Sequence, residues 1–217
     1  MRDVYIVSAK RSAVGKAPRG TLRNTRPDDL AAGVLSKIYD ETKNFDLETV
    51  DDVIVGCAMP EAEQGMNVAR FIALLSGLPD HVPAVTINRF CSSGLQSIAM
   101  AHDRIKAGNA ECIIAGGTET MSLVPMMGHK VVGSRNVNDN HPDFYLGMGL
   151  TAENVAHEYK ISREAQDEFA FQSHQKAHAA RSKGLFKDEI VPYEVVSRQP
   201  GAEGEVKLNR HLFDTDE

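Results

Sequence analysis

The chain has 217 residues, of which 42% are hydrophobic and 25% charged, as in an ordinary globular protein with one sizeable domain or a domain with a large insertion. Its formal net charge is −6, and its acidic and basic residues are mixed along the chain, so no basic run indicates a nucleic-acid groove. No apolar stretch approaches the roughly 18 residues that a membrane-spanning helix needs.

The N-terminus places charged residues directly before a short β-like run and has no small-residue cleavage site, so no secretory signal is predicted. The three cysteines, at positions 57, 91 and 112, are odd in number and lack the spacing of metal ligands. Free thiols in a reducing compartment are therefore predicted. We expect a cytoplasmic protein with no nucleic-acid or membrane partner.

The first half of the chain alternates predicted strands with predicted helices. Short β-branched or apolar runs predict strands at residues 4–8, 53–55, 85–87 and 112–115. Apolar residues at helical spacing predict helices at residues 28–40, 67–76 and 95–105, with Gly77 and Gly108 as the stops of the last two. This alternation is typical of a βαβ arrangement around a mainly parallel sheet.

The character of the sequence changes after about residue 118. Residues 121–143 are rich in Gly, Asn, His and Met and show weak periodicity. Beyond them the pattern predicts two helices and one strand, over residues 151–159, 162–183 and 189–196, with Ser162 as a helix N-cap. The remaining residues are polar and predict no closing element. We interpret this second half as a separate sub-domain inserted after the sheet.

Cys91 lies between a predicted strand and a predicted amphipathic helix, and two serines and a glycine follow it. The N–H groups and positive dipole end of a helix favour a thiolate, which is the nucleophilic form of cysteine. The small neighbours leave room for a substrate carbonyl, and backbone N–H groups at such a turn can stabilise an oxyanion. Position alone also fits a small buried structural residue, which is the role predicted for Cys57 and Cys112.

Several segments resemble motifs of the thiolase family. Residues 88–96, Asn-Arg-Phe-Cys-Ser-Ser-Gly-Leu-Gln, are similar to the family's nucleophile loop, in which a Cys-x-Ser follows a strand. The other similar segments are residues 7–15, 115–122, 148–156, 161–167 and 186–192. They occur in the family's order and at about its spacing across nearly the whole chain. The resemblance implies that Cys91 is the acyl-accepting nucleophile, with its backbone N–H in an oxyanion hole.

The resemblance also implies the thiolase fold, in which two α/β halves form a five-layered sandwich and an inserted loop domain covers the active site. Residues 1–118 then correspond to the N-terminal α/β half, a mainly parallel mixed sheet with helices. Residues 119–217 correspond to most of the α+β loop domain, and the C-terminal thiolase domain is absent from the sequence. Met148 matches a family position that contacts the pantetheine arm of CoA.

In thiolases a cysteine attacks the keto carbonyl of a 3-oxoacyl-CoA, releases acetyl-CoA and retains the acyl group as a thioester. Free CoA then accepts the acyl group, so CoA is a substrate, and no metal or other cofactor is implied. His174 and His178 share a helix face at i and i+4. We expect them to be a solvated surface pair rather than a metal site.

Motifs of the family's C-terminal half do not occur in the sequence: the Gly-His-Pro of the activating histidine, the Asn-Glu-Ala-Phe loop and the Cys-x-Gly of the acid–base cysteine. His141 precedes a proline but lacks the preceding glycine. We therefore expect a piece of a longer thiolase, or one half of a split one. Negligible thiolysis is expected from this chain alone, because losing a triad-like partner costs several orders of magnitude.

The leading hypothesis is the acyl-accepting half of a degradative 3-ketoacyl-CoA thiolase. Gly147 stands where biosynthetic acetoacetyl-CoA thiolases often carry a histidine, and two serines rather than Gly-Ser follow the nucleophile. A biosynthetic acetyl-CoA acetyltransferase and a condensing ketoacyl synthase are the alternatives within the same chemistry. From a different class, a non-catalytic half-thiolase would serve as an assembly module. Self-association is expected in each case, since an unfinished sheet exposes backbone pairing groups, and the resemblance to thiolases implies a homodimer or homotetramer.

Overall fold

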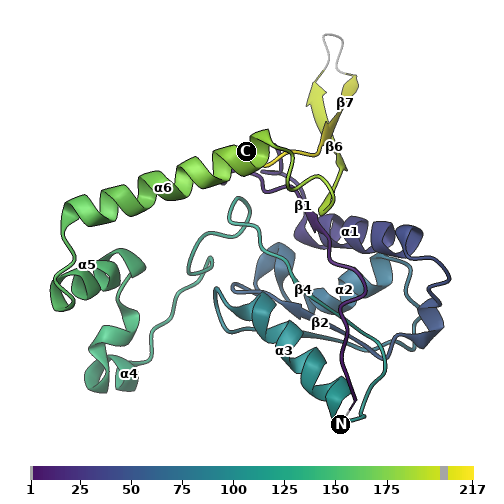
Figure 1. Ribbon diagram of the computed structural model, residues 1–217, viewed down its shortest axis with the longest axis horizontal. Coiled ribbons are helices and arrows are strands. Elements are labelled where there is room, and N and C mark those ends of the chain that lie inside the picture. The colour runs from purple at the N-terminus through teal and green to yellow at the C-terminus, as the bar shows by residue number, and fades with distance from the viewer. Residues whose placement is uncertain (1, 201–204) are drawn as a thin grey trace. The chain divides into compact units, whose positions relative to one another are not determined.

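The computed structural model describes residues 2–200 and 205–217 (Figure 1). Residue 1, from the predicted N-terminal domain, and residues 201–204, from the predicted loop domain, lie outside the described residues. Helices alternate with parallel strands along the first half, which confirms the predicted α/β fold. Among the helices that the structure describes, none is both long enough and apolar enough to cross a membrane.

The chain forms two compact units. One unit comprises Met1–His129 together with Asp188–Glu217, and the other comprises Lys130–Lys187. The last thirty or so residues thus pack with the N-terminal part of the chain, where β5 pairs with β1. The boundary at residue 118, which was drawn from the change in sequence character and from the family resemblance, stays a prediction.

A three-stranded parallel sheet organises the first unit. Its strand order is β3 (Ala84–Ile87), β2 (Asp52–Gly56) and β4 (Ile113–Gly117), so β2 lies in the centre. Val53 of β2 pairs with Ala84 on one side and with Ile114 on the other. All residues of β2 are buried, because a central parallel strand is covered on both faces.

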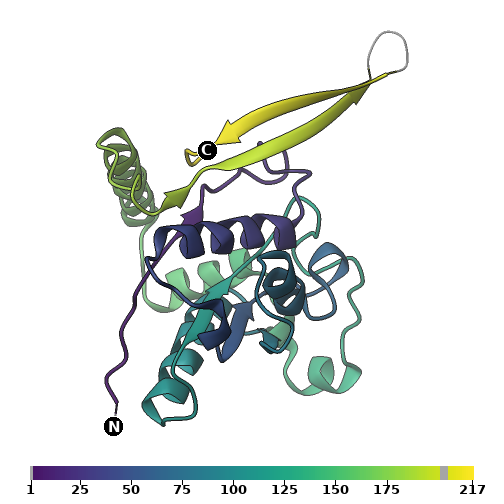
Figure 2. The ribbon, with the colours of Figure 1, turned by 90° about the vertical axis from the view of Figure 1, so that its right-hand side faces the viewer.

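Alternate residues of β2 face different helices. Val53 and Val55 belong to the main hydrophobic cluster with α2 (Val68–Leu75), and residues of α1 (Pro27–Glu41) pack against this cluster. Figure 2 shows α1 as a separate layer beside the sheet. The intervening residues of β2 face α3 (Ser93–Lys106), since Asp52 forms an ion pair with Arg104 of that helix.

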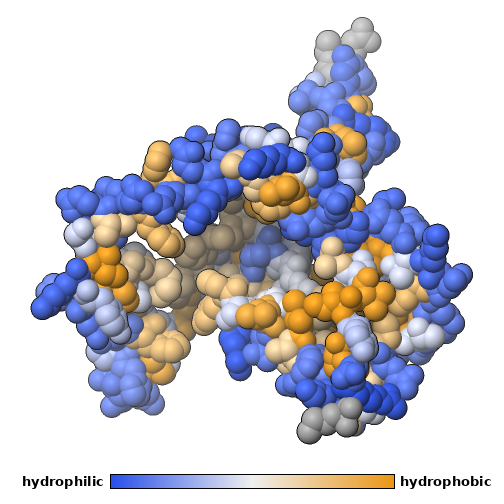
Figure 3. Space-filling view, viewed as in Figure 1, coloured by the Kyte–Doolittle hydropathy of each residue, from blue (hydrophilic) through white to orange (hydrophobic). Residues whose placement is uncertain are grey.

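Helix α3 buries the opposite face from the one that its apolar spacing indicates. Leu95 is 70% exposed and Ile98 is 45% exposed. The buried residues of this helix are small, namely Ser93, Ser97 and Ala101. Only small side chains fit there, because the first turn of α3 lies almost against the backbone of β2. Hydrophobic side chains consequently remain on the surface of the α/β unit, as the space-filling view shows (Figure 3).

The strand predicted at residues 4–8 is wrong. The structure has no strand there, and Tyr5, Ile6 and Val7 are each more than three-quarters exposed. The first strand is β1 (Arg11–Ser12), which pairs in parallel with β5 (Ile190–Val191). A β-branched run becomes a strand only where another strand pairs with its backbone, and among the described residues none pairs with residues 4–8.

The polar end of the chain forms a strand that the sequence pattern does not predict. Antiparallel pairing joins β6 (Tyr193–Pro200) to β7 (Val206–Phe213) as a two-stranded ribbon (Figure 2). In β7 only Phe213 is buried. Val206, Leu208 and Leu212 do stand at alternate positions of β7, but all three are more than half exposed, so this alternation does not mark a buried face.

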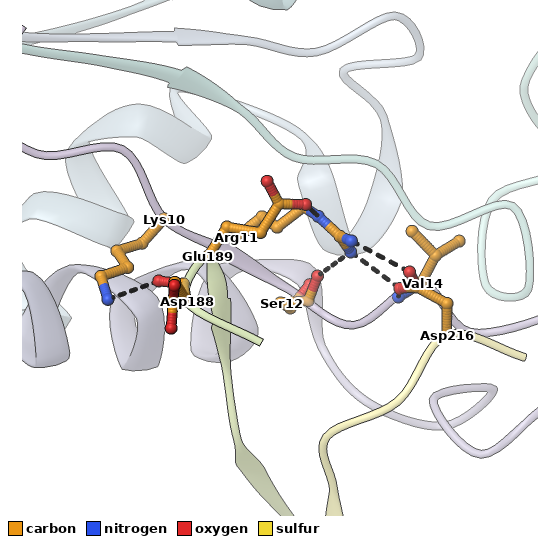
Figure 4. A network of polar contacts seen from close by, with 7 residues as sticks. All are labelled: Lys10, Arg11, Ser12, Val14, Asp188, Glu189 and Asp216. Atoms are coloured by element: carbon orange, nitrogen blue, oxygen red, sulfur yellow. Dashed lines mark hydrogen bonds and ion pairs between the residues drawn. The ribbon is translucent and has the colours of Figure 1, made fainter. Parts of the chain in front are cut away.

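Arg11 connects the start of the chain with its end (Figure 4). Its guanidinium donates two hydrogen bonds to the carboxylate of Asp216, at 2.7 and 2.9 Å, and one to Glu189 at 2.7 Å. Asp216 also accepts a hydrogen bond from the Val14 N–H at 2.8 Å. Paired hydrogen bonds between a guanidinium and a carboxylate fix direction as well as distance, so they orient residues 11–14 against the C-terminal segment.

The second unit consists of helices and their connections. Its helices are α4 (Arg135–Asn140), α5 (Met148–Glu158) and α6 (Arg163–Ser182). The predicted N-cap is confirmed, since the Ser162 hydroxyl accepts a hydrogen bond from the Ala165 N–H at 3.2 Å. Helix α4 was not predicted, because its asparagines and aspartate obscure any apolar periodicity.

Replacement of Gly56 by alanine is predicted to destabilise the protein by about 1–3 kcal/mol, the usual cost of overpacking. A Cβ atom at Gly56 would overlap the carbonyl group of Ser93 and lie 2.6 Å from the Gly94 nitrogen. Gly116→Ala is the matched control, because a Cβ atom at this neighbouring strand position meets open space. Urea unfolding measures both variants, and equal free energies of unfolding would contradict this account of the contact.

Candidate active site

Cys91 lies where β3 meets α3, at the carboxyl edge of the parallel sheet. Strand β3 ends at Ile87, the helix begins at Ser93, and the Cys91 side chain is exposed between them. Open α/β sheets bind their ligands beyond the carboxyl ends of the strands. The structure thus places the predicted nucleophile where a substrate can reach it.

The residue before the cysteine has an unusual backbone conformation. Phe90 has a φ of +47°, in the left-handed region that side-chain-bearing residues seldom adopt. The Asn88 carboxamide holds this turn, since its oxygen accepts a hydrogen bond from the Phe90 N–H at 2.8 Å. Its nitrogen donates to the Ala58 carbonyl at 3.0 Å, which connects the turn to the loop after β2.

Ser93 closes the turn from the helix side. This residue is only 3% exposed, and its hydroxyl accepts a hydrogen bond from the Arg89 N–H at 2.8 Å and donates one to the Phe90 carbonyl at 2.6 Å. Within the described part of the chain, no hydrogen bond occupies the Cys91 N–H. A backbone donor is therefore available beside the thiol.

Glycine brings the start of α3 close to the sheet. Gly56 ends β2 directly beneath Ser93, and a Cβ atom built on Gly117 of β4 would lie 3.4 Å from the Gly94 Cα. The Ser97 hydroxyl lies 2.8 Å from the Gly116 carbonyl oxygen, which adds a polar contact between the helix and β4. The cysteine turn is thus fixed to two strands besides its own.

Polar side chains join the loops that follow β2 and β4 at the same edge. The Glu119 carboxylate accepts hydrogen bonds from the Ala58 N–H, at 2.6 Å, and from the side-chain amide of Gln64. Gln64 is fully buried, and its side-chain oxygen accepts a hydrogen bond from the Thr120 N–H at 2.9 Å. Buried amides with such partners hold loops in one arrangement, so the surroundings of the turn are well defined.

The other two cysteines differ from Cys91 in burial. Cys57 is 1% exposed, and burial, with a smaller effect of the nearby Glu119 carboxylate, raises the pKa of its thiol to about 12. Burial also raises the pKa of Cys112, with Asp51 adding to the effect. A raised pKa lowers the thiolate fraction of both thiols, which agrees with their predicted structural role.

A comparison with protein families identifies the chain. The family model described as "Thiolase, N-terminal domain" matches residues 4–214, which is nearly the whole sequence. The chain belongs to the thiolase family.

Curated thiolases agree with this assignment. A 3-ketoacyl-CoA thiolase of Bacillus subtilis is 48% identical over 217 residues, covering 100% of this chain and 55% of the relative. A 3-ketoacyl-CoA thiolase of Serratia proteamaculans is 39% identical, covering 99% and 54%, and a beta-ketoadipyl-CoA thiolase of Acinetobacter baylyi is 41% identical, covering 92% and 53%. The chain spans about half the length of the curated relatives it matches.

The structure locates the other predicted site residue without testing its role. Met148 is the first residue of α5, in the unit Lys130–Lys187, and is 68% exposed. Its contact with the pantetheine arm stays a prediction. Among the described residues, no three His, Cys, Asp or Glu side chains gather in a way that could hold a metal ion.

Two residues that shape this thiolase turn were not singled out from the sequence. Gly56 could have been recognised from its position, since a glycine at the end of a predicted strand indicates that another element approaches the strand backbone closely. Asn88 carries a weaker one, because asparagine is common at turns that hydrogen-bond their own backbone. The left-handed conformation of Phe90 had no signal, since aromatic residues seldom adopt it.

Alkylation is predicted to discriminate among the three cysteines. At about pH 8, iodoacetamide is expected to modify exposed Cys91 first and to modify buried Cys57 only after unfolding, because the thiolate must form and be reached. Mass spectrometry of timed samples follows the labels. Cys91→Ser, which removes the exposed thiol, is the control, and labelling of Cys57 ahead of Cys91 would contradict the assignment.

The pKa of Cys57 predicts how stability depends on pH. Its value is about 12 in the folded protein against an ordinary 9.0, so between these values the folded state retains a proton that the unfolded chain has lost. The free energy of unfolding therefore falls as pH rises through this window. The Cys57→Ala variant has no thiol at this position, so its free energy of unfolding lacks this pH-dependent contribution. We expect the stability difference between wild type and variant to narrow by about 1 kcal/mol from about pH 8 to about pH 10 in urea unfolding, and a constant difference would refute the shift.

Proposed function

We propose that this chain supplies the acyl-accepting nucleophile of a 3-ketoacyl-CoA thiolase and acts together with a C-terminal thiolase half. The observation that carries the proposal is the exposed Cys91 at the start of α3, within a chain that belongs to the thiolase family. The contrast with Cys57 and Cys112 supports the choice of nucleophile, because burial raises the pKa of both other thiols.

The proposed reaction has two steps. The Cys91 thiolate attacks the C3 keto carbonyl of a 3-oxoacyl-CoA, the C2–C3 bond breaks, and the departing enolate of acetyl-CoA takes a proton. The shortened acyl group remains on Cys91 as a thioester. A CoA thiolate then attacks this thioester, forming the shortened acyl-CoA and releasing the Cys91 thiolate. In family terms, the acid and base that move the protons belong to the C-terminal half.

The geometry of the turn suits such a thioester intermediate. The Cys91 N–H, which has no partner among the described residues, is proposed as an oxyanion donor for the tetrahedral intermediate. Because Asn88 and Ser93 hold the turn before substrate arrives, this donor needs little reorganisation during the reaction. Met148 is proposed to contact the pantetheine arm of CoA, and CoA itself enters as a substrate rather than as a bound cofactor.

The substrate class follows from the relatives and from one departure in the sequence. The relatives are named for 3-ketoacyl-CoA and for beta-ketoadipyl-CoA, so a 3-oxoacyl-CoA is the proposed substrate. Gly147, in place of the histidine often found in biosynthetic acetoacetyl-CoA thiolases, favours the degradative direction over condensation of two acetyl-CoA molecules. A cytoplasmic location and a homodimer or homotetramer are part of this proposal.

Thiolysis is predicted to require both halves and Cys91. The chain alone is expected to show negligible cleavage of acetoacetyl-CoA in the presence of CoA. Addition of the C-terminal domain of the Bacillus subtilis relative is expected to produce measurable cleavage, because it restores the acid and base. Cys91→Ala in the reconstituted pair is expected to lower the rate by at least about 10⁴-fold, as removal of a nucleophile does elsewhere.

Spectrophotometric loss of acetoacetyl-CoA measures this rate. Cys112→Ala is the matched control, since it removes another thiol from the same unit and should leave the rate within about twofold, like other changes outside the reacting groups. A full rate from the chain alone, or an unchanged rate in the Cys91→Ala pair, would show that the proposed division of roles is wrong.

A further inference from the structure

The conformation of Phe90 needs an explanation, because burial of its side chain does not supply one. The ring is 57% exposed, so packing does not compel the φ of +47°. A bulky residue held in this region is strained and persists only where surrounding contacts impose it. Such residues gather at functional sites, and this one directly precedes Cys91.

The contacts that impose it come from both sides of the turn. Asn88 accepts from the Phe90 N–H and donates to the Ala58 carbonyl, so it fixes the Phe90 amide relative to the end of β2. Ser93 accepts from the Arg89 N–H and donates to the Phe90 carbonyl. Both peptide groups of Phe90 are therefore held. Ser93 also packs against Gly56 of β2, whereas Asn88 is exposed and its hydrogen bonds serve only to hold the turn and anchor it to the loop after β2.

The direction of the Cys91 N–H depends on this arrangement. Rotation about the N–Cα bond of Phe90 turns the peptide group that follows, and this peptide group carries the Cys91 N–H. If Phe90 relaxed to a negative φ, the donor and the thiol would point elsewhere while α3 and the sheet remained folded. A misplacement of about 1 Å at a reacting centre can cost about a hundredfold in rate.

We infer that Asn88 is a positioning residue for acyl transfer, which holds Phe90 in the left-handed conformation and so directs the Cys91 N–H and thiol toward the substrate carbonyl. This inference rests on the proposed function of Cys91 as acyl acceptor. Asn88 acts through the turn and takes no part in bond making.

Two reactions of Cys91 distinguish a positioning role of Asn88 from an effect on how accessible the thiol is. Acetylation depends on alignment of the turn, whereas alkylation depends mainly on access to the thiol. The chain is incubated with acetyl-CoA in the presence of the C-terminal domain of the Bacillus subtilis relative, or alone with iodoacetamide. Intact mass followed by peptide mapping gives the rate of each modification at Cys91. Asn88→Ala is expected to lower the acetylation rate about tenfold to a hundredfold and to change alkylation by less than about threefold, because only acyl transfer needs an aligned oxyanion donor.

Asn67→Ala is the matched control. Asn67 is also an exposed asparagine whose carboxamide makes two hydrogen bonds, one to the Ala84 carbonyl at 2.9 Å and one from the Thr86 hydroxyl at 2.8 Å. The Asn67→Ala variant loses two hydrogen bonds to β3, as Asn88→Ala loses two hydrogen bonds at the turn, but the lost bonds lie away from Cys91. It should leave the ratio of acetylation to alkylation within about twofold of wild type, as for other sites outside the reacting groups.

A second background tests the mechanism itself. Glycine adopts positive φ without strain, so Asn88→Ala should lower acetylation much less in a Phe90→Gly chain than in wild type. The same comparison of the two backgrounds is made by thermal unfolding. Asn88→Ala is expected to lower Tm by about 2–4 °C in wild type and by less than half of that in the Phe90→Gly chain.

The outcomes are distinct. Wild-type acetylation in a folded Asn88→Ala chain, or equal losses in both backgrounds, would overturn the inference. If the wild-type chain takes up no acetyl group even in the presence of the C-terminal domain, the proposed acyl-accepting function fails, and the Tm comparison then decides whether Asn88 holds Phe90. Equal Tm shifts in both backgrounds would overturn that remaining claim as well.

Discussion

The close contact between the first turn of α3 and the end of β2 is the constraint on which the site depends. Gly56 has no side chain, so Ser93 and Gly94 can lie almost on the strand backbone, and α3 buries small residues instead of leucine and isoleucine. This contact fixes where the helix begins. Since Cys91 lies two residues before that start, the contact also fixes the proposed nucleophile at the carboxyl edge of the sheet.

The three thiols of the chain differ in their surroundings, although all three adjoin strands of the same sheet. Cys57, one residue beyond β2, is buried with a raised pKa, and Cys112, just before β4, is partly buried with the same direction of shift. Cys91 alone is exposed. Within this half of a thiolase, burial and a raised pKa therefore make the other two thiols less available for acylation than Cys91. The parallel sheet thus supplies both the reactive position and the protection of the remaining thiols.

The sequence predicts the central features because they follow from local patterns. Strands β2, β3 and β4 have apolar runs, the helices between them have helical spacing, and the thiolase motifs identify Cys91. The failures have physical causes. Residues 4–8 lack a pairing strand, β7 is exposed on both faces, and the packing of α3 depends on Gly56, which is distant in the sequence. The role of Asn88 depends on a backbone angle that no residue pattern encodes.

The central claim is that Cys91 accepts the acyl group, and the most direct measurement locates that group. The chain, paired with the C-terminal domain of the Bacillus subtilis relative, is incubated with acetoacetyl-CoA without free CoA and quenched in acid, which preserves thioesters, and tandem mass spectrometry then assigns the modified residue of the chain. The account predicts one acetyl group on the peptide that contains Cys91, with Cys57 and Cys112 unmodified. An acetyl group on another residue, with Cys91 left free, would contradict it.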